Sequence, residues 1–92
     1  MGKIYGYVVN KRGNPIEHAR VRLKGIRTKV SRSTVSDADG FFEFNDLGAD
    51  TYMLFANKDR YKKAKVTVKL SVGEGKEIKI KMTKKKKNKT GQ

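Results

Sequence analysis

The sequence predicts an all-β fold, a seven-stranded antiparallel β-sandwich of Greek-key type that is followed by a disordered basic C-terminal tail. Three observations predict it. Apolar and polar residues alternate over short segments, which is the pattern of a strand with one buried face. Turn residues separate these segments every 8 to 14 residues. No stretch of helical periodicity competes with them, so the segments are expected to build sheets alone.

Seven segments carry the strand pattern. They are residues 4–9, 19–25, 34–36, 41–44, 51–57, 65–71 and 77–83. The polar and basic residues 26–33 are expected to form a mobile loop before the short third segment. The residues expected to face the core are Ile4, Gly6 and Val8 in the first segment, Ala19, Val21 and Leu23 in the second, Phe42 and Phe44 in the fourth, Tyr52, Leu54 and Ala56 in the fifth, Val66, Val68 and Leu70 in the sixth, and Ile78, Ile80 and Met82 in the last.

Turn chemistry explains where these segments end. Residues 10–15 read Asn-Lys-Arg-Gly-Asn-Pro, a turn cluster that places the only proline where it interrupts no sheet ladder. Residues 37–40 read Asp-Ala-Asp-Gly, in which the aspartates can bond the backbone and Gly40 is free to take a positive φ. Residues 73–75, Gly-Glu-Gly, indicate a hairpin.

One domain, residues 1–83, accounts for the folded part of the chain, and residues 84–92 form the tail. The tail holds five lysines and no apolar side chain, so nothing in it can pack. The absence of cysteine fits a reducing compartment, and neither a signal peptide nor a transmembrane stretch is visible. We therefore expect a soluble cytoplasmic protein, although a domain cut from a longer secreted chain would look the same.

Spaced glycines and apolar residues over roughly residues 4 to 82 form a recognisable string. Its members are Gly6, Val8, Gly13, Pro15, Ile16, Ala19, Val21, Leu23, Asp37, Gly40, Phe42, Phe44, Leu47, Tyr52, Leu54 and Tyr61. This string resembles the carboxypeptidase regulatory-like domain, and it departs from that family at Asp50 and Arg60, where members usually have glycine. The resemblance implies a prealbumin-like (transthyretin-like) sandwich, placed beside the carbohydrate-binding-like folds. It also implies a non-catalytic module that supports folding, docking or ligand contact, with no catalytic residue to carry over.

Charge is the second prominent feature, with a formal net charge of +14 on 92 residues. Residues 1–51 carry a net +3, and residues 52–92 carry a net +11. Cations that alternate outward on strands, together with the tail, predict a polyanion-binding surface. The residues of this predicted surface are Arg20, Arg22, Lys24, Lys65, Lys69, Lys79, Lys81, Lys84, Lys85, Lys86, Lys87 and Lys89. The alternative is a solvated face whose lysines discourage pairing at the sheet edges.

Outward-facing aromatic residues suggest a second kind of contact. Tyr5 and Tyr7 are expected to point away from the core together with Val9, and Phe55 is expected to do so with Met53. Beside basic residues, Tyr5, Tyr7 and Phe55 form a candidate platform on which bases or sugar rings could stack. The alternative is that these rings pack under a loop, the tail or a partner subunit.

Catalytic and metal sites are not predicted. Asp37, Asp39 and Glu43 lack the further early ligand, the glutamate at position 12 and the flanking helix of an EF-hand. His18 is the only histidine and, without cysteine, cannot found a usual zinc or copper site. No nucleophile or acid–base constellation appears, so we expect a protein that is not an enzyme and needs no cofactor.

The leading hypothesis is therefore a non-catalytic binding module that contacts a polyanion, in the first place RNA, a ribonucleoprotein or DNA, mainly through phosphates. The first alternative is an accessory domain that docks carbohydrate or a protein partner. The second is a structural subunit that pairs with another chain through a strand edge.

Overall fold

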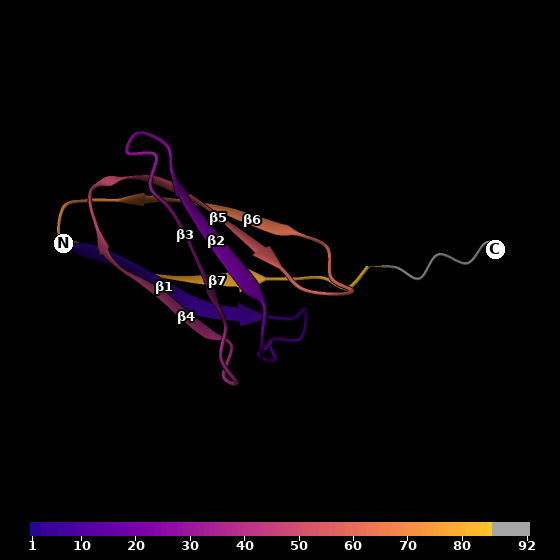
Figure 1. The fold of residues 1–92 in the computed structure, drawn as a ribbon. Coiled ribbons are helices and arrows are strands. Elements are labelled where there is room, and N and C mark those ends of the chain that lie inside the picture. Colours follow the sequence, from indigo (N-terminus) through magenta and orange to yellow (C-terminus); the bar gives the residue numbers. More distant parts are fainter. Residues whose placement is uncertain (86–92) are drawn as a thin grey trace.

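The computed structural model describes residues 1–85 and confirms a β-sandwich (Figure 1). Its strands are β1 (Gly2–Val9), β2 (Arg20–Gly25), β3 (Ser31–Val35), β4 (Phe41–Leu47), β5 (Asp50–Asn57), β6 (Ala64–Leu70) and β7 (Gly75–Lys81). In this described part there is no helix of the length and apolarity that a membrane span requires.

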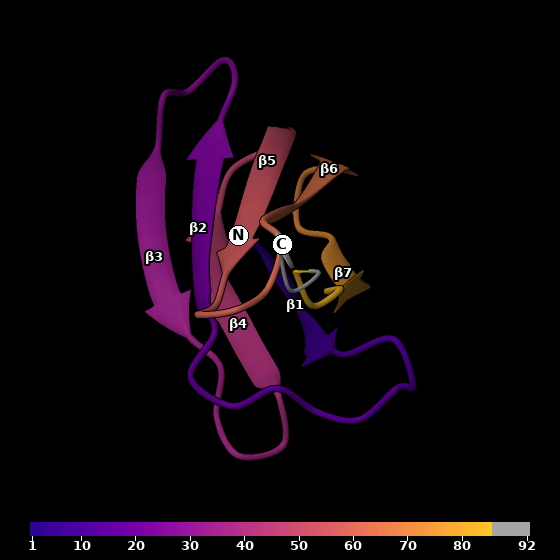
Figure 2. The same cartoon turned by 90° about the vertical axis from the view of Figure 1, so that its right-hand side faces the viewer.

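The strands form two sheets that pack face to face (Figure 2). One sheet has the order β4-β1-β7, and the other has the order β3-β2-β5-β6. Every pair is antiparallel apart from β1 and β7, in which residues 3–9 run parallel to residues 75–81. The predicted sandwich is confirmed, but the parallel pair departs from the predicted antiparallel arrangement. The hairpin predicted at residues 73–75 is wrong, because β6 and β7 lie in different sheets and do not pair. Apolar alternation shows which side of a strand is buried, but it carries no information about the direction of a neighbour.

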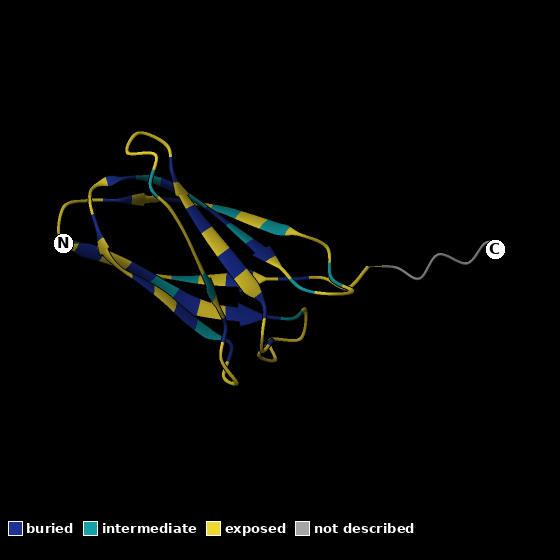
Figure 3. Ribbon diagram, in the orientation of Figure 1, coloured by how far each residue is buried: buried dark blue, intermediate teal, exposed yellow. Residues whose placement is uncertain are grey.

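The core lies between the two sheets, as the dark stripes of Figure 3 show. Nearly all residues predicted to face inward are buried there, and Val66 and Ile78 are half-buried and pack against the same cluster. Val9 differs from the prediction, because it was expected to face outward and is only 6% exposed. The loop that follows β1 folds back over it, with Pro15 bridged to Val9 and Ile16 donating its N–H to the carbonyl of Val8 at 2.9 Å.

Strand β3 begins earlier than the sequence predicts, inside the segment that was expected to be a mobile loop. It pairs with β2 from Ser31, opposite Lys24, to Val35, opposite Arg20. No period-two apolar pattern marks this strand, because it lies at the edge of its sheet and its inward positions hold Arg32 and Thr34. The Arg32 guanidinium donates to the backbone carbonyls of Asn45 and Asp46, which ties this edge to the opposite sheet.

The predicted turn at residues 37–40 is confirmed. The Asp37 carboxylate accepts the backbone N–H groups of Asp39 and Phe41, each at 2.9 Å. Gly40 has a φ of 77°, and a Cβ at this position would lie 2.5 Å from the carbonyl oxygen of Val8. The turn therefore needs glycine both for its backbone conformation and for its close approach to β1.

Candidate nucleic-acid interface

The outer face of the β3-β2-β5-β6 sheet is basic. The cations that point outward from its strands, which we call the basic face, are Arg20, Arg22, Lys24, Lys65 and Lys69. All five side chains are exposed, and no carboxylate occupies an outward position on any of the four strands. Among residues 1–85, Lys76 pairs with Glu74 and the His18 ring contacts Glu17, and neither carboxylate contacts any of these cations. The face therefore presents unneutralised positive charge to solvent.

Strand register places an aromatic ring inside this basic face. Phe55 on β5 is paired with Arg22 on one side and with Lys65 on the other. Directly paired side chains on one sheet face lie within contact distance, so the half-exposed Phe55 ring is flanked by cations on both neighbouring strands. Phe55 thus faces outward, as the alternation along its strand predicts, and the pairing of β5 with β2 and β6 places it beside basic residues.

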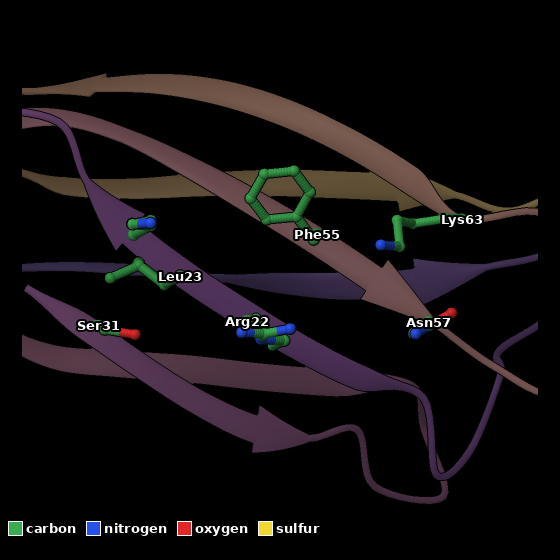
Figure 4. A pocket seen from close by; sticks show the side chains of 7 residues that line it. Arg22, Leu23, Ser31, Phe55, Asn57 and Lys63 are labelled. Carbon is green, nitrogen blue, oxygen red and sulfur yellow. The ribbon is translucent and has the colours of Figure 1, made fainter.

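A shallow hollow of about 230 Å³ lies next to this ring, and we call it the Phe55 hollow. Its lining residues are Arg22, Leu23, Lys24, Ser31, Phe55, Asn57 and Lys63. Figure 4 shows the Phe55 ring and the Lys63 side chain on one side of this region and Arg22 on the other. Lys63 comes from the loop before β6 and was not among the residues predicted from sequence.

A second hollow, of about 420 Å³, continues the positive surface around the end of the sheet. It is lined by His18, Arg20, Asn57, Lys58, Asp59, Arg60, Tyr61 and Lys85. Asn57 lines both hollows, so they adjoin at the end of β5. Lys58 and Arg60 are not among the residues predicted from sequence to bind a polyanion, because they lie in a loop where no strand periodicity shows which way a side chain points. The signal that could have found them is the four cations of residues 58–63.

The chain returns to this second hollow at the end of its described part. Lys84 forms an isolated antiparallel β-bridge with Tyr61, and the N–H of Lys85 donates to the carbonyl of Arg60 at 2.9 Å. The predicted disordered tail was expected to start at Lys84, and its first two residues are instead held beside the β5–β6 loop. Lys86, Lys87 and Lys89 lie outside the described residues. Arg60, at one of the family's glycine positions, has a φ of 72°, so the turn keeps a glycine-like conformation.

The remaining predicted residues lie on the opposite sheet. Register places Tyr5 between Glu43 and Glu77. It places Tyr7 between Phe41 and Lys79, and Lys81 lies further along β7 beside Val9. This outer face therefore carries charges of both signs, and the structure does not bring its tyrosines together with Phe55. The rings of Tyr7 and Phe41 meet edge to face, with 5.5 Å between their centroids.

Asp50, at the other glycine position of the family, anchors the loop between β2 and β3. Its carboxylate accepts the backbone N–H groups of Arg27, Thr28 and Thr51 and the hydroxyl of Thr28, at distances of 2.7 to 3.2 Å. Burial alone would raise the pKa of Asp50, which is 6% exposed. The hydrogen bonds outweigh it and lower the pKa from 3.8 to about 2. This acidic group therefore stays ionised inside the basic molecule and has a structural role.

No metal or catalytic constellation was predicted from the sequence, and the side chains of residues 1–85 form no cluster of three or more metal-ligating groups. The His18 ring is exposed and lies 3.2 Å from the Glu17 carboxylate. His18 lines the second hollow beside Arg20, so its place in the structure is a basic surface.

Comparison with known proteins places this geometry in a family. The sequence matches the carboxypeptidase regulatory-like domain over residues 3–83. No curated protein sequence matches the chain significantly. Several solved structures share the fold.

One is the type II cohesin–X–dockerin complex from Acetivibrio cellulolyticus, at 26% identity and a TM-score of 0.62 over 89% of this chain. The Bacillus anthracis TIE protein has a TM-score of 0.76 at 11% identity over 90% of this chain. Wild-type catechol 1,2-dioxygenase of Acinetobacter radioresistens has a TM-score of 0.73 at 10% identity over 94% of this chain. This chain spans between 16% and 57% of the length of these three proteins. At so low an identity, the similarity to the dioxygenase shows that the fold is shared and nothing about activity. By its sequence pattern and its sandwich, the chain belongs to the carboxypeptidase regulatory-like domain family.

Proposed function

We propose that this protein is a non-catalytic binding module whose basic face contacts the phosphate backbone of a nucleic acid. The observation that carries the proposal is the segregation of charge. One sheet presents five exposed cations and no carboxylate, whereas the outer face of the other sheet carries Glu43 and Glu77 among its lysines. Like charges that converge on one face repel each other, and a polyanion relieves that repulsion.

Counterion release gives this interaction a measurable signature. Each phosphate that a lysine or arginine neutralises releases condensed ions, so the logarithm of the affinity falls linearly with the logarithm of the salt concentration. The slope is about −0.7 per contact for single strands and about −0.9 for duplex DNA. Contacts that reach phosphates alone carry little sequence information, so we expect weak sequence preference.

The test compares two triple variants of equal net charge. Replacing Arg20, Arg22 and Lys24 with glutamine removes β2's contribution to the basic face, and replacing Lys3, Lys79 and Lys81 with glutamine removes three cations from the opposite sheet. Fluorescence anisotropy of labelled RNA and DNA across a salt series should show the slope shrinking by about 2 in the first variant only. A third protein ending at residue 85 measures what Lys86, Lys87 and Lys89 add, while it keeps the contacts of Lys84 and Lys85.

Equal losses in the two triple variants would refute a localised interface, because net charge alone would then set the affinity. Binding only at low salt, in every protein, would also refute the proposal. If a sulfated polysaccharide bound more strongly than any nucleic acid, the basic face would still be the binding surface, but its ligand would be a polyanion other than a nucleic acid.

A second candidate function is docking of a protein partner. It is favoured by the 26% identity to a chain of the cohesin–X–dockerin complex, which is an assembly of proteins. The edge-to-face pair of the exposed Tyr7 and the half-buried Phe41 on the opposite sheet is the surface that would serve it. A purified partner whose binding is lost in Tyr7→Ser and kept in the Arg20, Arg22 and Lys24 triple variant would establish this function.

A further inference from the structure

We infer that the Phe55 hollow holds one unpaired base, and hence that the preferred ligand of the basic face is a single-stranded nucleic acid. The inference rests on the proposed function and narrows it. Its evidence is the position of one aromatic ring among cations, the size of the hollow beside it, and the continuation of both into the second hollow.

The Phe55 ring lies where a base could stack on it, and the neighbouring cations lie where they could contact the phosphates. Phe55 is half-exposed on the outer face, paired with Arg22 on β2 and Lys65 on β6. A base that stacks on this ring holds its own backbone close to the sheet, within reach of the long side chains on the two flanking strands. Aromatic rings alternating with cations are the common arrangement of surfaces that bind single strands.

The hollow is too small for a large ligand. Its volume of about 230 Å³ lies below the ~300 Å³ at which pockets for drug-sized molecules begin. Taken alone, the Phe55 hollow has room for one flat heterocycle, and a longer ligand would have to continue into the second hollow. Ser31 and Asn57 add a hydroxyl and an amide to its lining, which can donate to or accept from the edge of a base.

A duplex cannot use this site without opening. In a helix both faces of each base are stacked and its pairing edge is occupied, so only a splayed or single-stranded base can lie on a protein ring. From Phe55 a bound nucleic acid can continue past the shared residue Asn57 to the second hollow. The lining of that hollow has four cations, Arg20, Lys58, Arg60 and Lys85, and one carboxylate, Asp59.

The decisive substitution is Phe55→Leu, which keeps an apolar side chain on the sheet and removes the aromatic face. Tyr7→Leu is its matched control, because it removes an outward aromatic ring from the opposite sheet. The probes are a labelled single-stranded oligonucleotide, a duplex of the same length, and inorganic polyphosphate, which has phosphates and no bases. Phe55→Leu should weaken binding of the single strand by about 5- to 150-fold, the range that alanine substitution gives for one stacked base. Binding of the duplex and of polyphosphate should not change, and Tyr7→Leu should leave all three unchanged.

A second readout reports the contact directly. The chain has no tryptophan, so Phe55→Trp introduces a single indole at the hollow. Its emission should be quenched by the single-stranded oligonucleotide, because the indole stacks on a base, and it should not be quenched by polyphosphate bound to the same face.

The outcomes separate the inference from the function on which it rests. If single strand, duplex and polyphosphate bind with equal affinity and Phe55→Leu changes none of these affinities, the proposed base site is refuted. The proposal that the basic face binds polyanions would then remain. If Phe55→Leu weakens polyphosphate as much as the single strand, Phe55 only supports the sheet, and the base site is again wrong. If none of the three polyanions binds the unmodified protein at physiological salt, both proposals fail.

Discussion

Replacing Gly6 with alanine is expected to destabilise the sandwich by about 3 kcal/mol, because the parallel pair of β1 and β7 leaves no room for a Cβ at this position. Gly6 is paired with Ile78. A Cβ on Gly6 would overlap the carbonyl oxygen of Ile78 and lie 2.7 Å from its carbonyl carbon. The obstacle is backbone, so no rotation of a side chain can relieve it.

The size of the effect follows from the separation that the two strands would need. Bringing the Cβ to ordinary contact with the Ile78 carbonyl carbon requires a movement of at least ~0.7 Å, enough to break a ladder hydrogen bond of normal length. Overpacking costs about 1–3 kcal/mol, and each lost hydrogen bond adds about 0.5–1.5 kcal/mol. Among the strands of residues 1–85, β1 is the only sheet partner of β7, so no other strand of that sheet compensates. A loss of 3 kcal/mol corresponds to a fall in Tm of roughly 12 to 24 °C for a domain of this size.

Urea denaturation and thermal unfolding, both followed by circular dichroism, measure this effect. The matched control is Gly75→Ala, in β7 and paired with Lys3 in the same parallel ladder, where a Cβ would meet nothing closer than the Lys3 side chain at 3.9 Å. That variant should unfold within about 0.5 kcal/mol of the unmodified protein. If Gly6→Ala were as stable as Gly75→Ala, the close parallel pairing of β1 and β7 would be refuted.

Three further predictions concern buried polar groups. The lowered pKa of Asp50 contributes stability that is present above pH 3.8 and is lost as the pH falls towards 2. In urea titrations, Asp50→Asn should therefore destabilise the protein more at pH 5 than at pH 2. An equal loss of unfolding free energy at the two pH values would contradict the hydrogen-bonded carboxylate. Ser36→Ala should cost about 2 kcal/mol in chemical denaturation, since its buried hydroxyl bonds two backbone groups 2.6 and 2.9 Å away that would be left unpaired. Burial, with the nearby Asp50 charge, raises the pKa of Tyr52. Tyr52→Phe should therefore remove absorbance change from the most alkaline part of a tyrosine titration, and an unchanged titration there would contradict the raised pKa.

Much of the fold could be predicted from the sequence, because burial of one strand face leaves a period-two record. The inward positions of the second and fifth strands, from Ala19 to Leu23 and from Tyr52 to Ala56, are confirmed. This period-two pattern does not reveal a strand that is held by backbone pairing and has no apolar side chains on its inward face. Strand β3 has Arg32 facing inward and no alternating pattern, so its early start was missed. Val9 was assigned to the solvent because the sequence does not show that the next loop folds over it.

The candidate site could be predicted in part for the same reason. The outward positions of Arg22, Lys65 and Phe55 follow from the alternation, whereas their adjacency depends on the pairing of three strands that are distant in sequence. Tyr5 and Tyr7 have the same outward pattern as Phe55, yet they belong to the other sheet. Lys58, Arg60 and Lys63 lie in a loop, where no periodicity indicates a direction.

The sequence by itself determined the fold class, the family, most of the core and the excess of positive charge. These properties follow from composition and from the local spacing of apolar and turn residues along the chain. Only the tertiary structure decided which strands are neighbours, and hence that β7 runs parallel to β1 and that one sheet collects cations around Phe55 while the other mixes them with glutamates. The physical reason is that a strand's own residues specify its buried face, whereas its partners are chosen by packing of the whole core and by backbone hydrogen bonds that are alike for every sequence.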